Sequence, residues 1–209
     1  MQHVNCAQLH RWANKLPRFR FPFDENKIPE DGIYLLFQKG ERAHGTNRIV
    51  RVGTHTGAGQ LRSRLRQHFL MENKDRSIFR KNIGRCLLNK TKDPFLKWWE
   101  IDLTPKQARD LHGRRVDGTK KEKLEKEISK YLRDNFSFVV VEVKNKRQRL
   151  ELEAKLVSTL SLCGECKPSS AWLGRYSPLQ KIRESGLWQV QGLYSAPLTA
   201  KDFVYLKDA

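Results

Sequence analysis

Runs of β-favouring apolar side chains predict three strands in this chain. The first two runs, 31–38 and 48–53, are separated by the polar, glycine-containing segment 39–47. They therefore predict an antiparallel hairpin whose loop is longer than a two-residue turn. The third run, 136–144, is rich in valine and phenylalanine and predicts the last strand of a small, mostly antiparallel sheet.

Apolar side chains that recur every three or four residues predict helices between and after these strands. The stripe of Leu61, Leu65 and Phe69 is one clear example. Further helices are predicted at 77–90, 118–135, 147–161 and 177–184. Residues 93–103, DPFLKWWEIDL, are expected to form either an extra strand or an aromatic-rich excursion.

Strands and helices in this order are typical of an α+β fold with a small sheet flanked by helices. We expect a basic N-terminal arm with a short helix at 1–31, a core at 32–165 and a C-terminal extension at 166–209 that packs on the core. The long helical interval of about 71–135 precedes the third strand, so it predicts a helical insertion in a smaller core.

The balance of charge indicates what the protein binds. The 209 residues include 41 Lys plus Arg against 23 Asp plus Glu, which gives a formal net charge of +18. Such a charge attracts polyphosphates, and nucleic acid is the favoured partner over an anionic lipid surface or a merely soluble basic protein. No apolar run approaches the ~20 residues of a membrane span, and the N-terminus lacks a secretory signal. We therefore expect a soluble, cytoplasmic protein with no membrane partner.

The cysteines give a weak metal signal. Cys163 and Cys166, in CGEC, have metal-ligand or redox spacing, but no second pair follows at zinc-finger distance. Reduced, unligated thiols are the favoured interpretation for these two residues and for Cys6 and Cys86. A structural zinc ion is the less favoured alternative.

The helix LRSRLRQHF carries candidate phosphate contacts. Arg64 and His68 are four residues apart and lie at the border of the apolar stripe, whereas Arg62 and Arg66 lie on the other flank. Cations at the border of the stripe are expected to lie near the sheet. The alternative is an ordinary basic surface helix.

Glu153 is the strongest candidate for a metal ligand. It falls inside the apolar stripe of the helix 147–161, while Glu151 points nearly the opposite way. A buried carboxylate is costly unless it is paired or binds a cation. A salt bridge to a neighbouring Lys or Arg is the alternative.

Four elements in order resemble the GIY-YIG nuclease family. They are Gly32-Ile33-Tyr34, Val52-Gly53-Thr54, the helix LRSRLRQHF and the helix LEAKLVSTL, which together cover roughly residues 32–160. The resemblance implies a three-stranded antiparallel sheet flanked by helices. It also implies hydrolysis of a DNA phosphodiester bond with one divalent cation per active site, Mg²⁺ or Mn²⁺.

The resemblance also implies roles for individual residues. Glu153 matches the glutamate that binds the metal, and Arg64 matches the arginine that contacts the scissile phosphate. Tyr34 would activate or position the attacking water, and strand alternation turns it to the face opposite its neighbours in the sequence. His68 matches the histidine one turn after the arginine.

The sequence departs from the family pattern at two places. Arg51 stands where the family usually has a second tyrosine, so we expect it to bind phosphate, with His55 as a candidate proton-transfer group. Ser169 and Ser170 stand where the family often has an asparagine, and they would contact Tyr34 or the substrate. The tail SSAWLGRYSP followed by SGLW is similar to bacterial family members that resemble restriction endonucleases.

These observations predict a metal-dependent endonuclease that acts on double-stranded DNA, in type II restriction or phage defence. The alternatives are a structure-selective repair nuclease and a non-catalytic nucleic-acid-binding module with a decayed site. The oligomeric state, including a homodimer, stays open. The residues expected to contact DNA are Arg62, Arg66, Arg80, Lys81, Arg85, Ser169 and Ser170.

Overall fold

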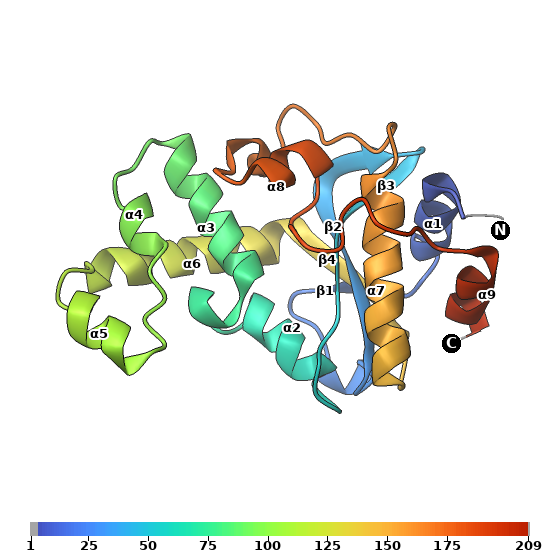
Figure 1. Cartoon of the computed structure of the whole chain (residues 1–209), viewed down its shortest axis with the longest axis horizontal. Coiled ribbons are helices and arrows are strands. Elements are labelled where there is room, and N and C mark those ends of the chain that lie inside the picture. Colours follow the sequence, from blue (N-terminus) through green and yellow to red (C-terminus); the bar gives the residue numbers. More distant parts are fainter. Residues whose placement is uncertain (1–3, 209) are drawn as a thin grey trace.

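The computed structural model describes residues 4–208, which contain one antiparallel sheet with the strand order β1-β4-β2-β3. The strands are β1 (Phe19–Arg20), β2 (Gly32–Ala43), β3 (Thr46–Gly53) and β4 (Phe136–Glu142). Strands β2, β3 and β4 form the predicted three-stranded sheet, and β1 adds a short edge strand beside β4 (Figure 1). The α+β fold is confirmed, with one two-residue strand more than the sequence predicted.

Helices surround this sheet and extend beyond it. They are α1 (Cys6–Ala13), α2 (Leu61–Phe69), α3 (Ile78–Lys90), α4 (Leu96–Trp99), α5 (Lys106–His112), α6 (Gly118–Asn135), α7 (Lys146–Ser161), α8 (Gln180–Ser185) and α9 (Ala200–Asp208). Short 3₁₀ helices occur at η1 (Glu25–Lys27), η2 (Lys74–Arg76) and η3 (Leu173–Tyr176). Within residues 4–208 none of the helices has both the length and the apolar character that a membrane span requires.

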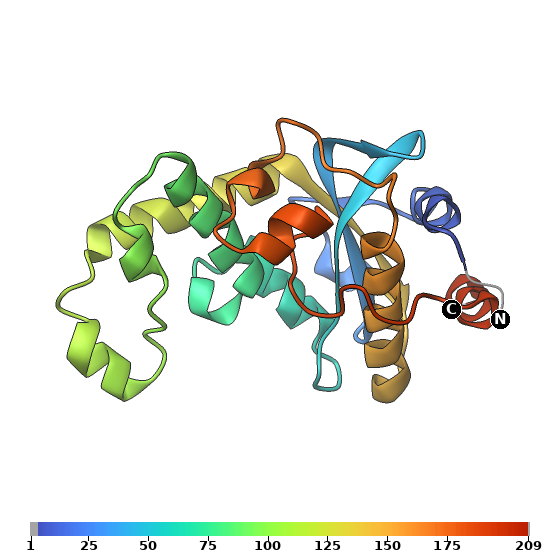
Figure 2. The same ribbon diagram turned by 45° about the horizontal axis from the view of Figure 1, so that its top comes forward.

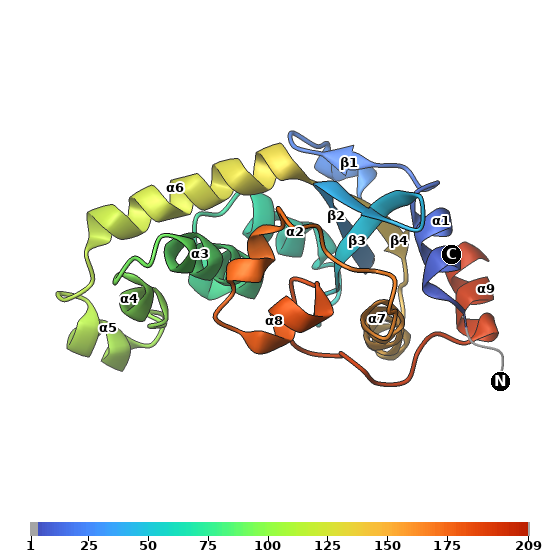
Figure 3. The same ribbon diagram turned by 90° about the horizontal axis from the view of Figure 1, so that it is seen from above.

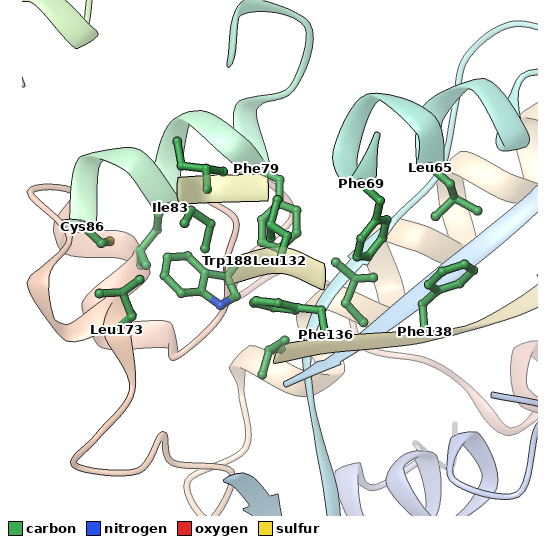
Figure 4. Packing of buried hydrophobic residues seen from close by; sticks show 14 of the residues in the cluster. Leu65, Phe69, Phe79, Ile83, Cys86, Leu132, Phe136, Phe138, Leu173 and Trp188 are labelled. Atoms are coloured by element: carbon green, nitrogen blue, oxygen red, sulfur yellow. The ribbon is translucent and has the colours of Figure 1, made fainter. Parts of the chain in front are cut away.

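Alternating side chains of the sheet build one hydrophobic cluster on each face. Tyr34 and Leu36 of β2 belong to the cluster formed with α2, α3 and α6. Their neighbours Ile33 and Leu35 belong to the opposite cluster, formed with α1 and α7. Figure 4 shows the first cluster, where Trp188 of the C-terminal extension packs among residues from α3, α6 and β4. The extension therefore contributes to the core.

The hairpin is tighter than the sequence predicted. Strands β2 and β3 continue through most of the polar segment 39–47, and only His44 and Gly45 remain between them. Both residues have positive φ angles, 50° and 75°, as a type I′ turn requires. The predicted longer loop is wrong because polar residues on an exposed hairpin tip still pair their backbones.

The helical insertion before the third strand is confirmed. Helices α3 to α6 lie between α2 and β4, and α6 runs from the sheet to the far end of the insertion (Figure 3). The aromatic segment 93–103 forms no strand but the short helix α4, whose Trp99 is fully buried. Trp99 packs directly over Gly84 of α3, where a Cβ atom would meet the indole ring at 2.5 Å.

The two ends of the described chain lie together (Figure 2). The Val4 amide donates a hydrogen bond to the Leu198 carbonyl at 3.0 Å. Trp12 of α1 makes an edge-on contact with Phe203 of α9, with ring centroids 5.5 Å apart. Both helices pack on the face of the sheet that α7 covers.

Candidate active site

Tyr34 and His68 form a buried pair on one face of the sheet. The Tyr34 hydroxyl lies 2.7 Å from His68 Nε2, and both side chains are fully buried. Alternation along β2 turns Tyr34 toward α2, as the sequence predicted. Gly53 faces Tyr34 across the β2–β3 pair, and a Cβ at this position would overlap the phenol. Glycine is therefore required here by the close approach of the Tyr34 ring.

A serine fixes the orientation of His68. His68 Nδ1 lies 2.8 Å from the hydroxyl of Ser77, the residue that caps α3 by accepting a hydrogen bond from the Arg80 amide. Burial lowers the pKa of His68 well below its usual value, and the positive charges of Arg64, Arg51 and Arg80 lower it further. The imidazole is therefore uncharged at neutral pH, with one nitrogen facing Ser77 and the other facing Tyr34.

Arg51 lies almost completely buried at the edge of a cavity of about 420 Å³. It pairs with Leu36 across the hairpin, and the register shifts after this pair, at the Leu36/Phe37 step. The Arg51 guanidinium lies 5.2 Å from the centroid of the Phe79 ring and donates a hydrogen bond to the Trp188 carbonyl. Its Nε has no hydrogen-bond partner among residues 4–208. The buried guanidinium therefore keeps one unsatisfied donor beside the cavity.

The irregular register changes the faces of the residues before Arg51 on β3. Strict alternation would place Ile49 on the face of Arg51, with Val50 and Val52 opposite. Instead Val50 packs in the cluster of Tyr34, whereas Ile49 and Val52 pack in the opposite cluster. The bulge at Val50 lies before Arg51, so Arg51 and Gly53 still share one face by alternation, and they pair with Leu36 and Tyr34.

Glu153 lies on the wall of the same cavity. Helix α7 has the predicted phase, because Leu152 and Leu156 are buried and Glu151 is exposed in an ion pair with Lys155. The Glu153 side chain is half-buried, and none of the ion pairs within residues 4–208 includes it. The expected alternative, a salt bridge, is therefore not formed.

The pKa of Glu153 is raised above its usual value. Burial is the main cause, and the charge of Arg51, a hydrogen bond from the Thr54 backbone and the charge of Arg64 oppose it. Arg64 itself is half-buried and donates hydrogen bonds to Gln67 Oε1 at 2.9 Å and to the Arg76 carbonyl at 3.1 Å. Its positive charge acts on both His68 and Glu153.

Two residues that the sequence did not single out complete the cavity. Asn82 of α3 is buried, and its side-chain Nδ2 has no hydrogen-bond partner in the described part of the chain, residues 4–208. Gln189 accepts a hydrogen bond from the Val52 amide at 2.9 Å and so extends the sheet edge into the cavity wall. The sequence indicated Asn82 in only one way, because this residue interrupts the apolar pattern of α3. Gln189 gave no signal because its position depends on the path of the C-terminal extension.

The sequence profile of the GIY-YIG domain family matches residues 7–197, which is most of the chain. No curated protein sequence and no solved structure matches the chain. The chain belongs to the GIY-YIG family. This GIY-YIG domain identifies a nuclease that acts on DNA, and nucleases of this family generally depend on a divalent cation.

His55 of this GIY-YIG domain is held in place by two hydrogen bonds to the backbone. Its Nδ1 donates to the Gly57 carbonyl at 2.6 Å, and its Nε2 accepts from the Gly32 amide at 3.2 Å. Burial lowers the pKa of His55, and the charge of Arg149 adds to this, while the Gly57 hydrogen bond and Asp31 oppose it. We correct the expectation of a proton-transfer role, because the backbone occupies both ring nitrogens.

Three of the expected DNA contacts on α3 are instead internal ion pairs. Arg80 is fully buried and bonds to both Glu125 Oε2, at 2.7 and 3.0 Å, and the His68 carbonyl, at 3.1 Å. Lys81 and Arg85 bond to Glu100, and their side chains are only 14% and 11% exposed. The prediction for Arg80 is wrong, because the insertion supplies acidic partners that the local sequence does not reveal.

The expected serine contact with Tyr34 is also wrong. The Ser169 hydroxyl donates to Glu41 at 2.5 Å, and Glu41 forms a buried pair with Arg48 at 2.6 Å. Ser170 is exposed. Ser169 therefore attaches the C-terminal extension to Glu41 of β2, while the Tyr34 hydroxyl contacts His68.

The outer arginines of α2 keep part of their charge accessible. Arg62 donates to the Ile28 carbonyl at 2.7 Å and is half-buried. Arg66 is 57% exposed, with its only ion-pair partner among residues 4–208, Glu25, at 3.6 Å. DNA contact by these two residues remains a prediction.

Proposed function

We propose that the chain is a metal-dependent endodeoxyribonuclease that hydrolyses double-stranded DNA in type II restriction or phage defence, in the bacterial cytoplasm. The observation that carries this proposal is Glu153. Its carboxylate is half-buried, has no ion-pair partner among residues 4–208 and lines a cavity together with Arg51. A carboxylate in such a place is stabilised when a cation binds it.

The surroundings of Glu153 fit Mg²⁺ or Mn²⁺. These hard cations prefer oxygen ligands, and Mg²⁺ typically takes one or two carboxylates while keeping several waters and substrate phosphate oxygens. Glu153 offers one carboxylate, and the cavity of about 420 Å³ leaves room for the remaining ligands. The bound cation would supply charge that stabilises the phosphate and the leaving oxygen.

Tyr34 is the candidate for accepting the proton of the attacking water. The low pKa of His68 makes an imidazolium unfavourable, so His68 acts as a hydrogen-bond donor rather than as a base. When the Ser77 hydroxyl donates to Nδ1, the proton of neutral His68 resides on Nε2 and points at the Tyr34 oxygen. In this arrangement His68 donates a hydrogen bond to the Tyr34 oxygen and fixes its position.

Access to Tyr34 requires a movement on DNA binding. Tyr34 and His68 are fully buried, whereas Arg51 and Glu153 line the cavity. Catalytic contacts commonly tighten only in the substrate complex. We therefore expect residues around the cavity to shift when the phosphate enters, so that the Tyr34 hydroxyl becomes accessible to the attacking water.

Arginines would stabilise the negative charge of the reacting phosphate. Among residues 4–208, Arg51 Nε has no hydrogen-bond partner, and the charge of Arg64 acts on both His68 and Glu153. Asn82, another residue of the cavity wall, has a buried side-chain nitrogen that also lacks a partner within this range. Preorganised donors at the point where charge develops accelerate such reactions.

The restriction role rests on the similarity of the tail to restriction-endonuclease-like family members. Part of this tail has a packing function, because Trp172 and Trp188 are fully buried and both donate their indole N–H to Gln38 Oε1, at 3.1 and 2.9 Å. The similarity is therefore direct support for a shared C-terminal architecture. It supports the restriction role only through that shared architecture.

Incubation of the purified protein with plasmid DNA tests the proposal. We expect discrete fragments in Mg²⁺ and no cleavage when a chelator removes the cation. Random nicking in Mg²⁺ would support a repair nuclease, and binding without cleavage would support a decayed site. Sedimentation of the protein with and without DNA would show whether a homodimer forms.

A further inference from the structure

Five metal-binding side chains from three distant segments meet at the end of the molecule opposite the helical insertion. Cys6 and His10 lie on α1, His44 lies in the β2–β3 turn, and Cys163 and Cys166 follow α7. Ligand atoms of Cys6, His10, His44 and Cys166 all lie within 4.8 Å of one another. Figures 1 to 3 agree in placing α1, the hairpin tip and the loop after α7 side by side.

His10 already uses both of its ring nitrogens. Nδ1 donates to the Cys6 carbonyl at 2.9 Å, and Nε2 accepts from the Ile49 amide at 3.1 Å. This neutral tautomer has no lone pair left for a metal. Its Nε2 lies 3.7 Å from the Cys166 sulfur, so His10 is placed to support the cluster from outside.

The distances among the other four side chains are compatible with ligands that share one ion. The ligand atoms of Cys6, His44 and Cys166 lie within 4.8 Å of one another, and His44 Nε2 lies 3.5 Å from the Cys163 sulfur. Two ligands of a tetrahedral zinc ion, with metal–ligand bonds of about 2.0–2.3 Å, are separated by roughly 3.3–3.8 Å. The nitrogen–sulfur distance of His44 and Cys163 falls in this range.

The surroundings of His44 also fit metal binding through Nε2. Its other nitrogen, Nδ1, lies 3.4 Å from a Glu165 carboxylate oxygen. Metal-binding histidines usually donate their second N–H to a carboxylate or carbonyl, which fixes the tautomer. Burial of the cluster is high, since Cys6 and Cys166 are 5% and 4% exposed.

We propose that Cys6, His44, Cys163 and Cys166 bind one structural Zn²⁺ ion. Three thiolates and one imidazole are soft and borderline ligands that select zinc over Mg²⁺ or Mn²⁺. Four protein ligands leave no open position for a substrate, so the ion stabilises structure. The site is separate from the cavity at Glu153, because Cys163 follows Glu153 by ten residues, mostly along α7, or about 15 Å at the helical rise.

The ion would cross-link three segments that are otherwise joined covalently only through the backbone. It connects α1 and the hairpin tip to the end of α7, the helix that carries Glu153. Sequence spacing indicated only half of the site, because only Cys163 and Cys166 are neighbours along the chain. The other two ligands, Cys6 and His44, come from segments far away in sequence.

Metal content tests the proposal directly. Protein purified without added metal should contain about one zinc per chain by mass spectrometry. Replacement by Co²⁺ should give the visible absorption of a tetrahedral site with thiolate charge-transfer bands. Protein that contains no zinc and takes up no Co²⁺, or that shows a disulfide among these cysteines, would overturn the proposal.

Single substitutions test the ligand set. Cys6→Ser, Cys163→Ser and His44→Asn should each lose the metal, whereas Cys86→Ser, which changes a buried thiol of α3 outside the cluster, should keep it. His10→Gln should retain the cobalt thiolate bands. Loss of the bands in His10→Gln and their retention in Cys163→Ser would overturn the assignment and make His10 the fourth ligand. Metal content and absorption are measured on soluble protein, so the result does not depend on nuclease activity.

Discussion

Helices α2 and α3 carry similar sets of basic residues but use them differently. The arginines of α2 contact backbone carbonyls, a glutamine and one carboxylate at 3.6 Å. The cations of α3 are paired with acids from the insertion, Arg80 with Glu125 and Arg85 with Glu100. The charge of α2 therefore remains for a phosphate, while the charge of α3 is compensated. Basic residues in a sequence thus indicate a nucleic-acid partner without locating the surface that binds it.

Removal of Arg80 is expected to have the largest effect on stability. Arg80→Ala leaves Glu125 buried and unpaired, which should lower the free energy of unfolding by about 3–5 kcal/mol. Urea unfolding followed by circular dichroism measures this change. Arg85→Ala is the matched control and should cost at most about 1 kcal/mol, since its partner Glu100 is partly exposed. Equal, small losses in both variants would contradict the structural role of Arg80.

Arg64 is expected to affect the chemical step. Arg64→Ala should lower the single-turnover cleavage rate by about 10²-fold or more, because it removes a preorganised positive charge. Arg62→Ala should mainly weaken binding, because Arg62 is a partly exposed residue for which we expect contact with the DNA backbone rather than with the reacting phosphate. If both variants lost rate equally, the two sides of α2 would not differ in function.

His68, buried where α2 meets α3, is expected to make stability depend on pH. It is uncharged in the folded state, whereas the unfolded state binds a proton below a pH of about 6.5. The free energy of unfolding should therefore fall as the pH drops below this value, and His68→Gln should lack this component. The pKa of His55 is also lowered, but His55 is present in both proteins. Its contribution to the pH dependence of stability therefore cancels when the wild type and His68→Gln are compared. Identical pH slopes would show that His68 is charged or accessible.

Arg66 is expected to have the smallest effect, on binding alone. Arg66→Ala should reduce the dependence of log Kd on log salt by about one unit, if this half-exposed side chain contacts a DNA phosphate. Arg85→Ala should leave the salt dependence unchanged. Fluorescence titrations at several salt concentrations measure both. If Arg85→Ala changed the salt dependence more than Arg66→Ala did, α3 rather than α2 would carry the charge that contacts DNA.

Local periodicity predicted most of the fold. The strands around Tyr34 and Val139, the helix of Glu153 and the helical insertion follow from apolar spacing, because burial of one face fixes the pattern along each element. The opposite orientations of Glu151 and Glu153 followed in the same way. The buried Tyr34–His68 pair brought together two residues that the sequence had placed in the site separately.

Long-range partners explain what the sequence could not predict. The bulge beside Arg51 and the acid partners of Arg80 depend on elements that are distant in the chain. Asn82 and Gln189 enter the cavity only because α3 and the C-terminal extension meet beside β3. A pattern read along one segment contains no information about such neighbours.

Single-turnover cleavage of plasmid DNA in Mg²⁺ by the wild type, Glu153→Gln and Glu151→Gln shows whether the cavity at Glu153 is a metal-dependent catalytic centre. We expect Glu153→Gln to bind DNA without cleaving it, because a metal ligand contributes mainly to the chemical step. Glu151→Gln changes only an exposed ion pair with Lys155 on the same helix and should cleave like the wild type. Normal cleavage by Glu153→Gln, or an equal loss in both variants, would mean that Glu153 does not hold a catalytic cation.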